Sequence, residues 1–415
     1  MARVIQAVEQ LKTAARTVRR LSTAEKNSAL LTLAEAVAAR EGEILAANAK
    51  DLQALAESTT AAFRDRLRLN PERIRAMVGG LRQVSALPDP VGELVEERVL
   101  ANGLHLRRVR APLGVIFMIF ESRPNVILEA FSLAFKAGNV IALRGGSESS
   151  ATSQALYQIM AQVLSRLPAL PFYGFEDFDR TLVESLLRRE DLIDVVVPRG
   201  GEALIQFVQR TALMPLIKND RGLCHTYVHA DADVEMAVRI VANAKTQRPG
   251  VCNSLETLLM HQDLASAVLP RLHQVTESVG LHWRVDEESQ RILNGFARVR
   301  AATAEDWDME HLDQVMNCKI VAGLDEAIQH IERHGSKHSE AIVTASADVA
   351  RRFQTEVDAA AVYWNASTRF TDGFEFGLGG ELGISTQKLH VRGPVGLREL
   401  TTPRWIGDGN GQIRE

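Results

Sequence analysis

Apolar and polar positions divide the chain into a helical first part and a later part in which strands and helices alternate. Between residues 22 and 90, apolar side chains recur about every 3.6 residues, which predicts amphipathic helices. Ser22 and Glu25 have the spacing of a capping box, and Asn70 before Pro71 is typical of a second helix start. We therefore expect the first hundred residues to be mainly helical.

A change to alternating apolar and polar residues at 97–110 indicates a β-hairpin. Its centre is Asn102-Gly103, the strongest short-range signal for a two-residue hairpin turn. Such a ribbon has little of its own to pack against, and it gains stability by pairing with another subunit. We interpret it, together with an extended stretch expected at 393–405, as an oligomerisation arm.

From residue 111 onward the pattern repeats strand, turn and helix. Expected strands at 115–120, 139–143 and 195–197 are linked by expected helices at 125–136 and 150–167. This order is typical of a parallel α/β unit, in which ligands bind beyond the carboxyl ends of the strands. The turns after two of these strands are rich in glycine and suit a dinucleotide phosphate: Arg144, Gly145, Gly146 and Ser147, then Gly200 and Gly201. Since the chain has no Gly-x-Gly-x-x-Gly motif, plain turn topology is the alternative.

A second α/β region begins near residue 225, and it contains the cysteine that is best placed to act as a nucleophile. Residues 234–245 are expected to form a helix and 254–261 a buried strand, with Pro249-Gly250 forcing a break between them. Cys252 lies on this turn, where Lys245 and Arg248 would favour the thiolate. The alternative is a small buried hydrophobic residue, which is the expectation for Cys224 and Cys318.

Two further groups of polar residues have alternative interpretations. Asn125 follows an expected strand, where its amide can stabilise an oxyanion or simply cap the next helix. His330, His334 and His338 recur every four residues, which on an unbroken helix would suggest zinc. Because Gly335 should end that helix and no His-Glu-x-x-His motif occurs, we predict a polar loop and no metal site.

Composition excludes several classes of protein. With 415 residues and 46% hydrophobic content, the chain is long enough for two or three domains with their own cores. The net charge of -4 gives no broad basic field, so a nucleic-acid partner is not expected. Residues 1–12 lack a signal-peptide core and the longest apolar run, 115–120, is too short for a membrane span. Three cysteines without paired spacing favour a reducing compartment, hence the cytoplasm.

Several motifs resemble known families. Pro124-Asn125, residues 138–144 and Gly250-Val251-Cys252 are similar to the aldehyde dehydrogenase superfamily. Within it, the blocks at 321–342, 364–373 and 383–394 resemble the gamma-glutamyl phosphate reductase family, also called glutamate-5-semialdehyde dehydrogenase. The resemblance covers essentially the whole chain.

The resemblance implies NADPH-dependent reduction of L-glutamate 5-phosphate to L-glutamate 5-semialdehyde, with release of phosphate, in proline biosynthesis. Cys252 would form a thioester while Asn125 and the Cys252 backbone N–H hold the oxyanion. Glu310 resembles the glutamate that contacts the nicotinamide ribose, and Arg144 and its glycine turn would approach the adenosine end. Candidates for binding the substrate carboxylate and phosphate are Arg123, Lys218, Lys245 and Arg248.

The chain also departs from its hydrolytic relatives. The stretch that matches their Glu-Leu-Gly-Gly-Lys motif, residues 216–222, contains no glutamate to activate water. A reductase that passes its acyl group to phosphate needs no such base. A hydrolytic aldehyde dehydrogenase is the first alternative function, a catalytically silent binding protein is the second, and a metallo-hydrolase built on the histidines is the third.

These observations predict an aldehyde-dehydrogenase-like α/β subunit of three parts. Residues 1–98 and 111–225 would form a Rossmann-type NADP-binding domain, residues 226–384 an α/β thiol domain, and residues 99–110 and 385–415 a β oligomerisation arm. The expected partners are the small substrate and a second copy of the chain. The family resemblance adds glutamate 5-kinase, which would supply the substrate.

Overall fold

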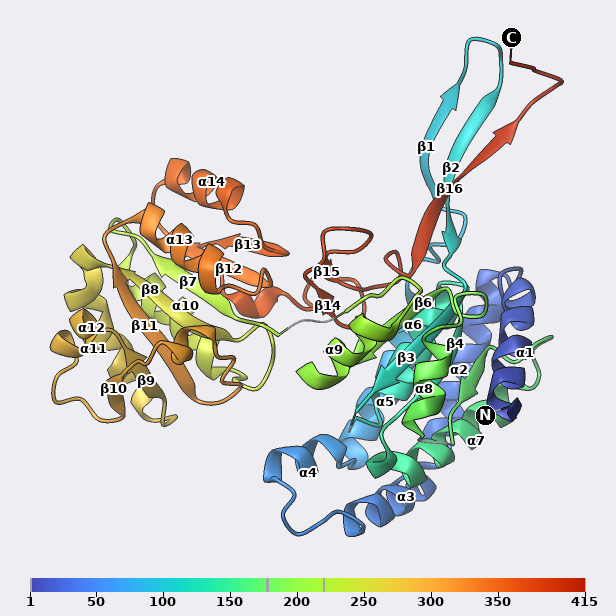
Figure 1. The fold of residues 1–415 in the computed structure, drawn as a ribbon, viewed down its shortest axis with the longest axis horizontal. Helices are drawn as coiled ribbons and strands as arrows, with labels where there is room; N and C mark the ends of the chain where they lie inside the picture. Colours follow the sequence, from blue (N-terminus) through green and yellow to red (C-terminus); the bar gives the residue numbers. More distant parts are fainter. Residues whose placement is uncertain (1, 122, 177–178, 219–220, 415) are drawn as a thin grey trace. The chain divides into compact units, whose positions relative to one another are not determined.

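The computed structural model describes residues 2–121, 123–176, 179–218 and 221–414, which form two compact units. Unit 1 takes in residues 1–219, 377–383 and 395–415, and unit 2 takes in residues 220–376 and 384–394. Each unit contains a parallel sheet with helices packed against it (Figure 1). The predicted α/β class is therefore confirmed in both units.

Helices form the first part of unit 1, as the apolar spacing predicts. They are α1 (Ala2–Val18), α2 (Thr23–Ala39), α3 (Glu41–Gln53), α4 (Ala61–Leu67) and α5 (Pro71–Ala86). The Glu25 N–H donates to Ser22 Oγ at 3.3 Å and the Ser22 N–H donates to Glu25 Oε2 at 2.7 Å. At the start of α5 the Arg73 N–H donates to Asn70 Oδ1 at 2.7 Å. Both predicted helix starts are confirmed.

The sheet of unit 1 is built by strand and helix in alternation. The elements are β3 (Val115–Phe120), α6 (Val126–Lys136), β4 (Val140–Arg144), η1 (Ser147–Ser149), α7 (Ser150–Leu164), β5 (Phe172–Gly174), α8 (Arg180–Leu186), β6 (Val195–Arg199) and α9 (Glu202–Thr211). All pairings in the strand order β5-β4-β3-β6 are parallel. Every residue of β3 is buried, because this central strand is covered on both faces.

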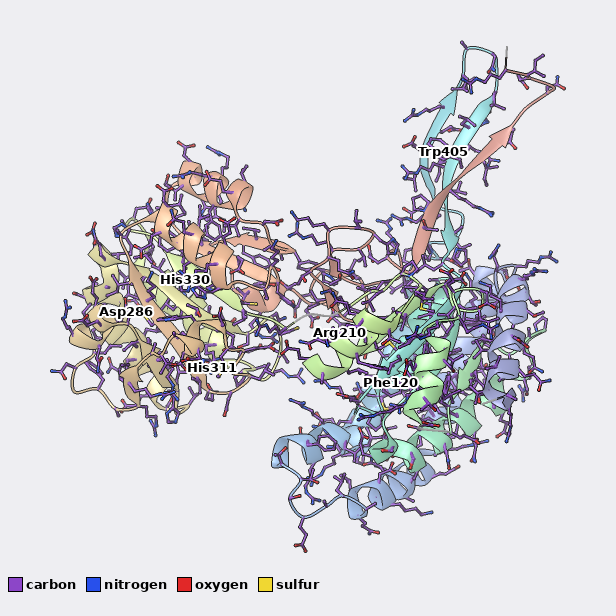
Figure 2. The ribbon with its side chains drawn as sticks, in the orientation of Figure 1. Phe120, Arg210, Asp286, His311, His330 and Trp405 are labelled. Carbon is purple, nitrogen blue, oxygen red and sulfur yellow. The ribbon has the colours of Figure 1, made fainter. Side chains whose placement is uncertain are left out.

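The predicted hairpin is present in unit 1 as part of a three-stranded antiparallel ribbon. Its strands are β1 (Leu94–Val99), β2 (His105–Pro112) and β16 (Thr401–Asp408), in the order β1-β2-β16. The ribbon projects from the sheet of unit 1 (Figure 1), and Trp405 lies on it (Figure 2).

The turn of this hairpin is longer than the two residues predicted. Strand pairing ends at Val99 and His105, and the Leu100 N–H donates to the Leu104 carbonyl at 2.9 Å. Gly103 adopts a positive φ of 81°, and Asn102 Oδ1 accepts from the Leu104 N–H at 3.1 Å. The Asn-Gly pair therefore does form the turn, but within a wider loop.

Unit 2 holds a larger parallel sheet. Its strands are β7 (Cys224–Val228), β8 (Leu255–His261), β9 (His282–Val285), β10 (Val299–Ala301), β11 (Val315–Val321), β12 (Ser339–Val343) and β13 (Ala361–Trp364), in the order β10-β9-β11-β8-β7-β12-β13. Its helices are α10 (Val234–Thr246), α11 (Gln262–Glu277), α12 (Glu287–Ile292), η2 (Glu305–Asp308), α13 (Leu324–His334), α14 (Ala347–Glu356) and η3 (Thr368–Phe370). A core around the fully buried Trp283 joins α10 and α11 to the sheet.

The observed units differ in three places from the predicted domain limits. The division falls at 219/220 instead of 225/226, because β7 pairs with β8 and β12 in unit 2. In the tail, β14 (Ile384–Ser385) pairs with β15 (Gly393–Pro394), so residues 384–394 belong to unit 2 and not to the arm. The hairpin itself belongs to unit 1. None of the described helices is both long enough and apolar enough to cross a membrane.

Candidate active site

The Cys252 side chain lies on a turn between α10 and β8, where a helix and a strand were predicted to flank it. Cys252 is partly exposed, whereas Cys224 and Cys318 are buried. Burial raises the pKa of the Cys224 and Cys318 thiols well above that of an ordinary cysteine. Cys252 is therefore the cysteine of unit 2 that is accessible and suited to act as a nucleophile.

The segment that leads into β7 passes directly against this turn at Gly222. A Cβ atom on Gly222 would lie 1.6 Å from the carbonyl oxygen of Cys252 and 2.7 Å from its Cα atom, so no side chain fits there. Two residues later, Cys224 Sγ donates a hydrogen bond to the same carbonyl oxygen at 3.2 Å. We call the turn between α10 and β8, residues 247–254, the thiol turn. Its backbone is thus positioned by residues that lie about thirty positions earlier in the chain.

Glu310, the residue expected at the nicotinamide ribose, is hydrogen-bonded to the segment before β7 that contains Gly222. Its Oε1 atom accepts a hydrogen bond from the Gly222 N–H at 2.8 Å. Next to it, Arg221 Nη1 donates to the Asp308 carbonyl at 3.0 Å. Gly222 therefore contacts the thiol turn through its Cα and the Glu310 carboxylate through its N–H.

Lys245, a predicted substrate ligand, is completely buried at the end of α10. Its Nζ donates to Glu256 Oε2 at 3.1 Å, and the Leu312 N–H donates to Glu256 Oε1 at 3.3 Å. Burial lowers the pKa of Lys245 and raises that of Glu256 to about 7, although the attraction between the two groups opposes both shifts. In this structure the Lys245 ammonium group contacts Glu256 and supports the thiol turn from the interior, where a substrate has no direct access to it.

The three regularly spaced histidines do not share one face. His330 and His334 lie on α13 with ring centroids 4.6 Å apart, and the helix ends at His334 as predicted. His338 lies beyond Gly335, with Nδ1 at 2.8 Å from Ser339 Oγ. Figure 2 shows His330 within unit 2, where burial strongly lowers its pKa. No group of three or more metal-binding side chains is placed to hold an ion in the described residues.

In unit 1 the predicted cofactor residues lie at the carboxyl ends of neighbouring strands. The sheet order places β3 between β4 and β6, and the direction of chain progression reverses between β3 and β6. Parallel sheets bind ligands at this reversal point. The following predicted residues therefore gather at one edge of one sheet: Arg123 and Asn125 after β3, Arg144, Gly145, Gly146 and Ser147 at the end of β4, and Gly200 and Gly201 after β6.

The glycine turns in unit 1 allow anionic groups to approach the backbone. A Cβ on Gly200 would lie 2.5 Å from Glu121 Oε2, and one on Gly146 would lie 2.1 Å from Glu148 Oε1. The Gly201 N–H, at the start of α9, donates to Glu121 Oε2 at 2.9 Å. This helix terminus thus binds a carboxylate oxygen, and the same arrangement suits a phosphate oxygen of a dinucleotide.

Asn125 is exposed at the start of α6, and its backbone is already helical, with φ of −60° and ψ of −27°. In the part of the chain that the structure describes, its side chain makes no capping hydrogen bond. The helix-cap role that was the alternative for Asn125 is therefore not observed. Lys218 is half-buried in unit 1, and residues 219 and 220 of the 216–222 stretch lie outside the described residues.

Sequence reasoning did not select Gly222, Cys224 or Glu256 as parts of the site. Gly222 stands in the 216–222 stretch, but no turn pattern distinguishes it. Glu256 did carry a usable signal, because a carboxylate inside a mainly apolar, buried strand needs a buried partner.

The sequence and fold of this chain are similar to those of known proteins over nearly its whole length. Residues 1–291 match the aldehyde dehydrogenase family. Gamma-glutamyl phosphate reductases from Moorella thermoacetica and Koribacter versatilis are 49% and 48% identical over 410 residues, covering 98% of this chain and 97% and 98% of theirs. The crystal structure of gamma-glutamyl phosphate reductase from Thermotoga maritima has a TM-score of 0.95 at 41% identity and covers 99% of both chains. The predicted aldehyde-dehydrogenase-like fold is confirmed.

Proposed function

The chain belongs to the aldehyde dehydrogenase family and, within it, to the gamma-glutamyl phosphate reductases, and from this premise we propose its reaction. It reduces L-glutamate 5-phosphate to L-glutamate 5-semialdehyde, releases phosphate and serves proline biosynthesis. The observation that carries the proposal is the partly exposed Cys252 on a turn fixed by Gly222 and Cys224.

Cys252 acts as the nucleophile. Its thiolate forms a bond to the acyl carbon of the substrate, the bond from that carbon to the phosphate oxygen breaks, and phosphate leaves with the electron pair. A thioester remains on Cys252. NADPH, when bound, supplies the hydride that reduces this thioester. The resulting thiohemiacetal then releases the aldehyde and returns the sulfur of Cys252 to its starting state.

Two donors stabilise the negative charge that develops on the acyl oxygen. One is the backbone N–H of Cys252, and the other is the side-chain amide of Asn125. The exposed Asn125 amide makes no helix-capping bond in the described residues, which leaves it available for this role. Loss of one such donor typically lowers the rate about a hundred- to a thousandfold.

The aldehyde dehydrogenase fold implies a nicotinamide dinucleotide cofactor, and we propose NADPH. Arg144 with Gly145, Gly146 and Ser147, together with Gly200 and Gly201, would hold its adenosine and phosphate part. Glu310 would contact the nicotinamide ribose. The residues fit this group, because the Gly201 N–H at the start of α9 already binds a carboxylate oxygen.

Cationic side chains would recognise the two anionic ends of the substrate. Arg123, Lys218 and Arg248 are the candidates for direct contact, and Arg248 is exposed on the thiol turn itself. Lys245 takes part through its buried contact with Glu256, which supports that turn.

The chain works as a homo-oligomer through the ribbon of β1, β2 and β16, whose outer strand β1 is mostly exposed. The enzyme is cytoplasmic, in keeping with its thiol chemistry. Glutamate 5-kinase, which makes the acyl phosphate, is the proposed protein partner.

The reverse reaction tests the proposed function. Purified protein is given glutamate 5-semialdehyde and NADP, and absorbance of NADPH is followed with and without phosphate. Reduction of NADP that requires phosphate supports the proposal. Full turnover without phosphate would identify a hydrolytic aldehyde dehydrogenase instead, and Cys252→Ser should abolish turnover in either case.

A further inference from the structure

The η3 segment is fastened to the thiol turn by hydrogen bonds. Asn253, the residue directly after Cys252, donates from Nδ2 to the carbonyl oxygens of Arg369 at 3.3 Å and Thr371 at 2.8 Å. In return, Thr368 Oγ1 donates to the Asn253 carbonyl at 2.8 Å. The backbone at Arg369 is therefore held in a fixed position relative to the nucleophile.

The guanidinium group of Arg369 is held as well. Its Nε donates to Gln247 Oε1 at 2.7 Å, and Gln247 belongs to the same turn as Cys252. No carboxylate of the described residues forms an ion pair with Arg369 within 4 Å, although the side chain is half-buried. A hydrogen bond at Nε leaves the two terminal nitrogens as a fork, the geometry that binds carboxylate or phosphate in a bidentate manner.

The electrostatic surroundings of this fork favour an anion. Partial burial lowers the pKa of Arg369, and the nearby Arg248 guanidinium lowers it further, while Asp372 and the Cys252 thiolate act in the opposite direction. The Arg248 guanidinium, on the same turn as Cys252, is thus a second cation whose charge acts on Arg369. A bound anion would neutralise the repulsion between them, and a negatively charged substrate would supply that anion.

We propose that Arg369, assisted by Arg248, binds the α-carboxylate of the glutamyl substrate and so determines specificity; this inference rests on the proposed function. The carboxylate stays attached through the acylation, reduction and release steps, whereas phosphate departs after the first. A cation held by the Gln247 side chain on the thiol turn suits the group that persists, because it keeps the acyl carbon aligned with Cys252 throughout.

Two aldehydes that differ at the carboxylate test this assignment. One is 5-oxopentanoate, the desamino analogue of glutamate 5-semialdehyde, and the other is pentanal, which lacks the carboxylate. Both are oxidised in the reverse direction with saturating NADP and phosphate, using wild type, Arg369→Gln, Arg369→Lys and the control Arg271→Gln. Arg271 is an exposed residue of α11 in unit 2 that pairs with Glu235.

For Arg369→Gln we expect kcat/KM for 5-oxopentanoate to fall roughly ten- to a hundredfold, as for loss of a charged hydrogen bond. For pentanal it should change less than about threefold, because that substrate offers the fork no anion. Arg369→Lys keeps the charge without the fork and should recover part of the loss. Arg271→Gln should match wild type with both aldehydes.

Other outcomes overturn the assignment. An equal loss with both aldehydes would mean that Arg369 only maintains the thiol turn. A rise in KM for phosphate, with the preference for 5-oxopentanoate unchanged, would place the phosphate at Arg369 instead. Failure of the proposed function is distinguishable, since it would appear as phosphate-independent turnover of the wild-type protein.

Discussion

Replacing Gly222 by alanine tests the idea that the segment before β7 positions the nucleophile. Gly222 packs against the backbone of Cys252 while its N–H binds the Glu310 carboxylate. An added methyl group would therefore act on the turn that holds the thiol and on the residue proposed to contact the cofactor. Both effects come from one small change that alters neither charge nor any reacting group.

The size of the disturbance follows from the contact distances. The new Cβ would lie 1.6 Å from the Cys252 carbonyl oxygen, whereas real Cβ atoms essentially never come closer than 3.0 Å to another heavy atom. Backbone on both sides must therefore separate by roughly 1 Å or more, a displacement that can lower a rate about a hundredfold. Overpacking of this kind also destabilises a protein by about 1–3 kcal/mol.

The assay is the reverse reaction with NADP and phosphate, combined with a thermal melt and the rate of Cys252 alkylation by iodoacetamide. We expect kcat to fall roughly a hundredfold, with a changed alkylation rate and a folded protein at the assay temperature. Gly323→Ala is the matched control, because no heavy atom lies within 4 Å of a Cβ at that position of unit 2.

One result would refute this reasoning. If Gly222→Ala kept kcat within about threefold of wild type, the thiol turn would tolerate a backbone displacement of roughly 1 Å, and its close packing would not be needed for catalysis. A large loss of activity with an equal loss in Gly323→Ala would indicate a general effect of the substitution.

Three further predictions concern the buried ion pair and the arm. Lys245→Met should lower the free energy of unfolding by about 3–5 kcal/mol because it leaves Glu256 buried without its cation, and adding Glu256→Leu should recover most of that loss in thermal melts. Because burial raises the pKa of Glu256 to about 7, the folded protein binds a proton that the unfolded chain releases. The contribution of Glu256 to stability should therefore fall as pH rises from about 5 to above 7, whereas buried histidines such as His330 act in the opposite direction. The free energy of unfolding of wild type minus that of Glu256→Gln should decline over this range, and a difference independent of pH would contradict the prediction. Lysine at the exposed positions Val95 and Val99 of β1 should reduce oligomer mass in sedimentation experiments if the ribbon pairs with a second copy.

Local patterns in the sequence determined much of the architecture. The continuous apolar run at 115–120 identifies a strand buried on both faces, and the 3.6-residue spacing of 234–245 identifies the helix before the thiol turn. Pro249-Gly250 marks the turn that carries Cys252, and Gly335 marks the end of α13. These features are recoverable because a helix, a strand or a turn depends mainly on residues close to one another in the chain.

Long motifs determined the family, but the contacts that position the thiol come from the tertiary structure. The Gly222 backbone meets Cys252, and Asn253 binds Arg369 and Thr371 more than a hundred residues later. Hydrophobic spacing shows which face of an element is buried and does not show what it packs against. For the same reason Lys245 looked like a substrate ligand in the sequence, and only the packing of α10 on β8 placed it against Glu256.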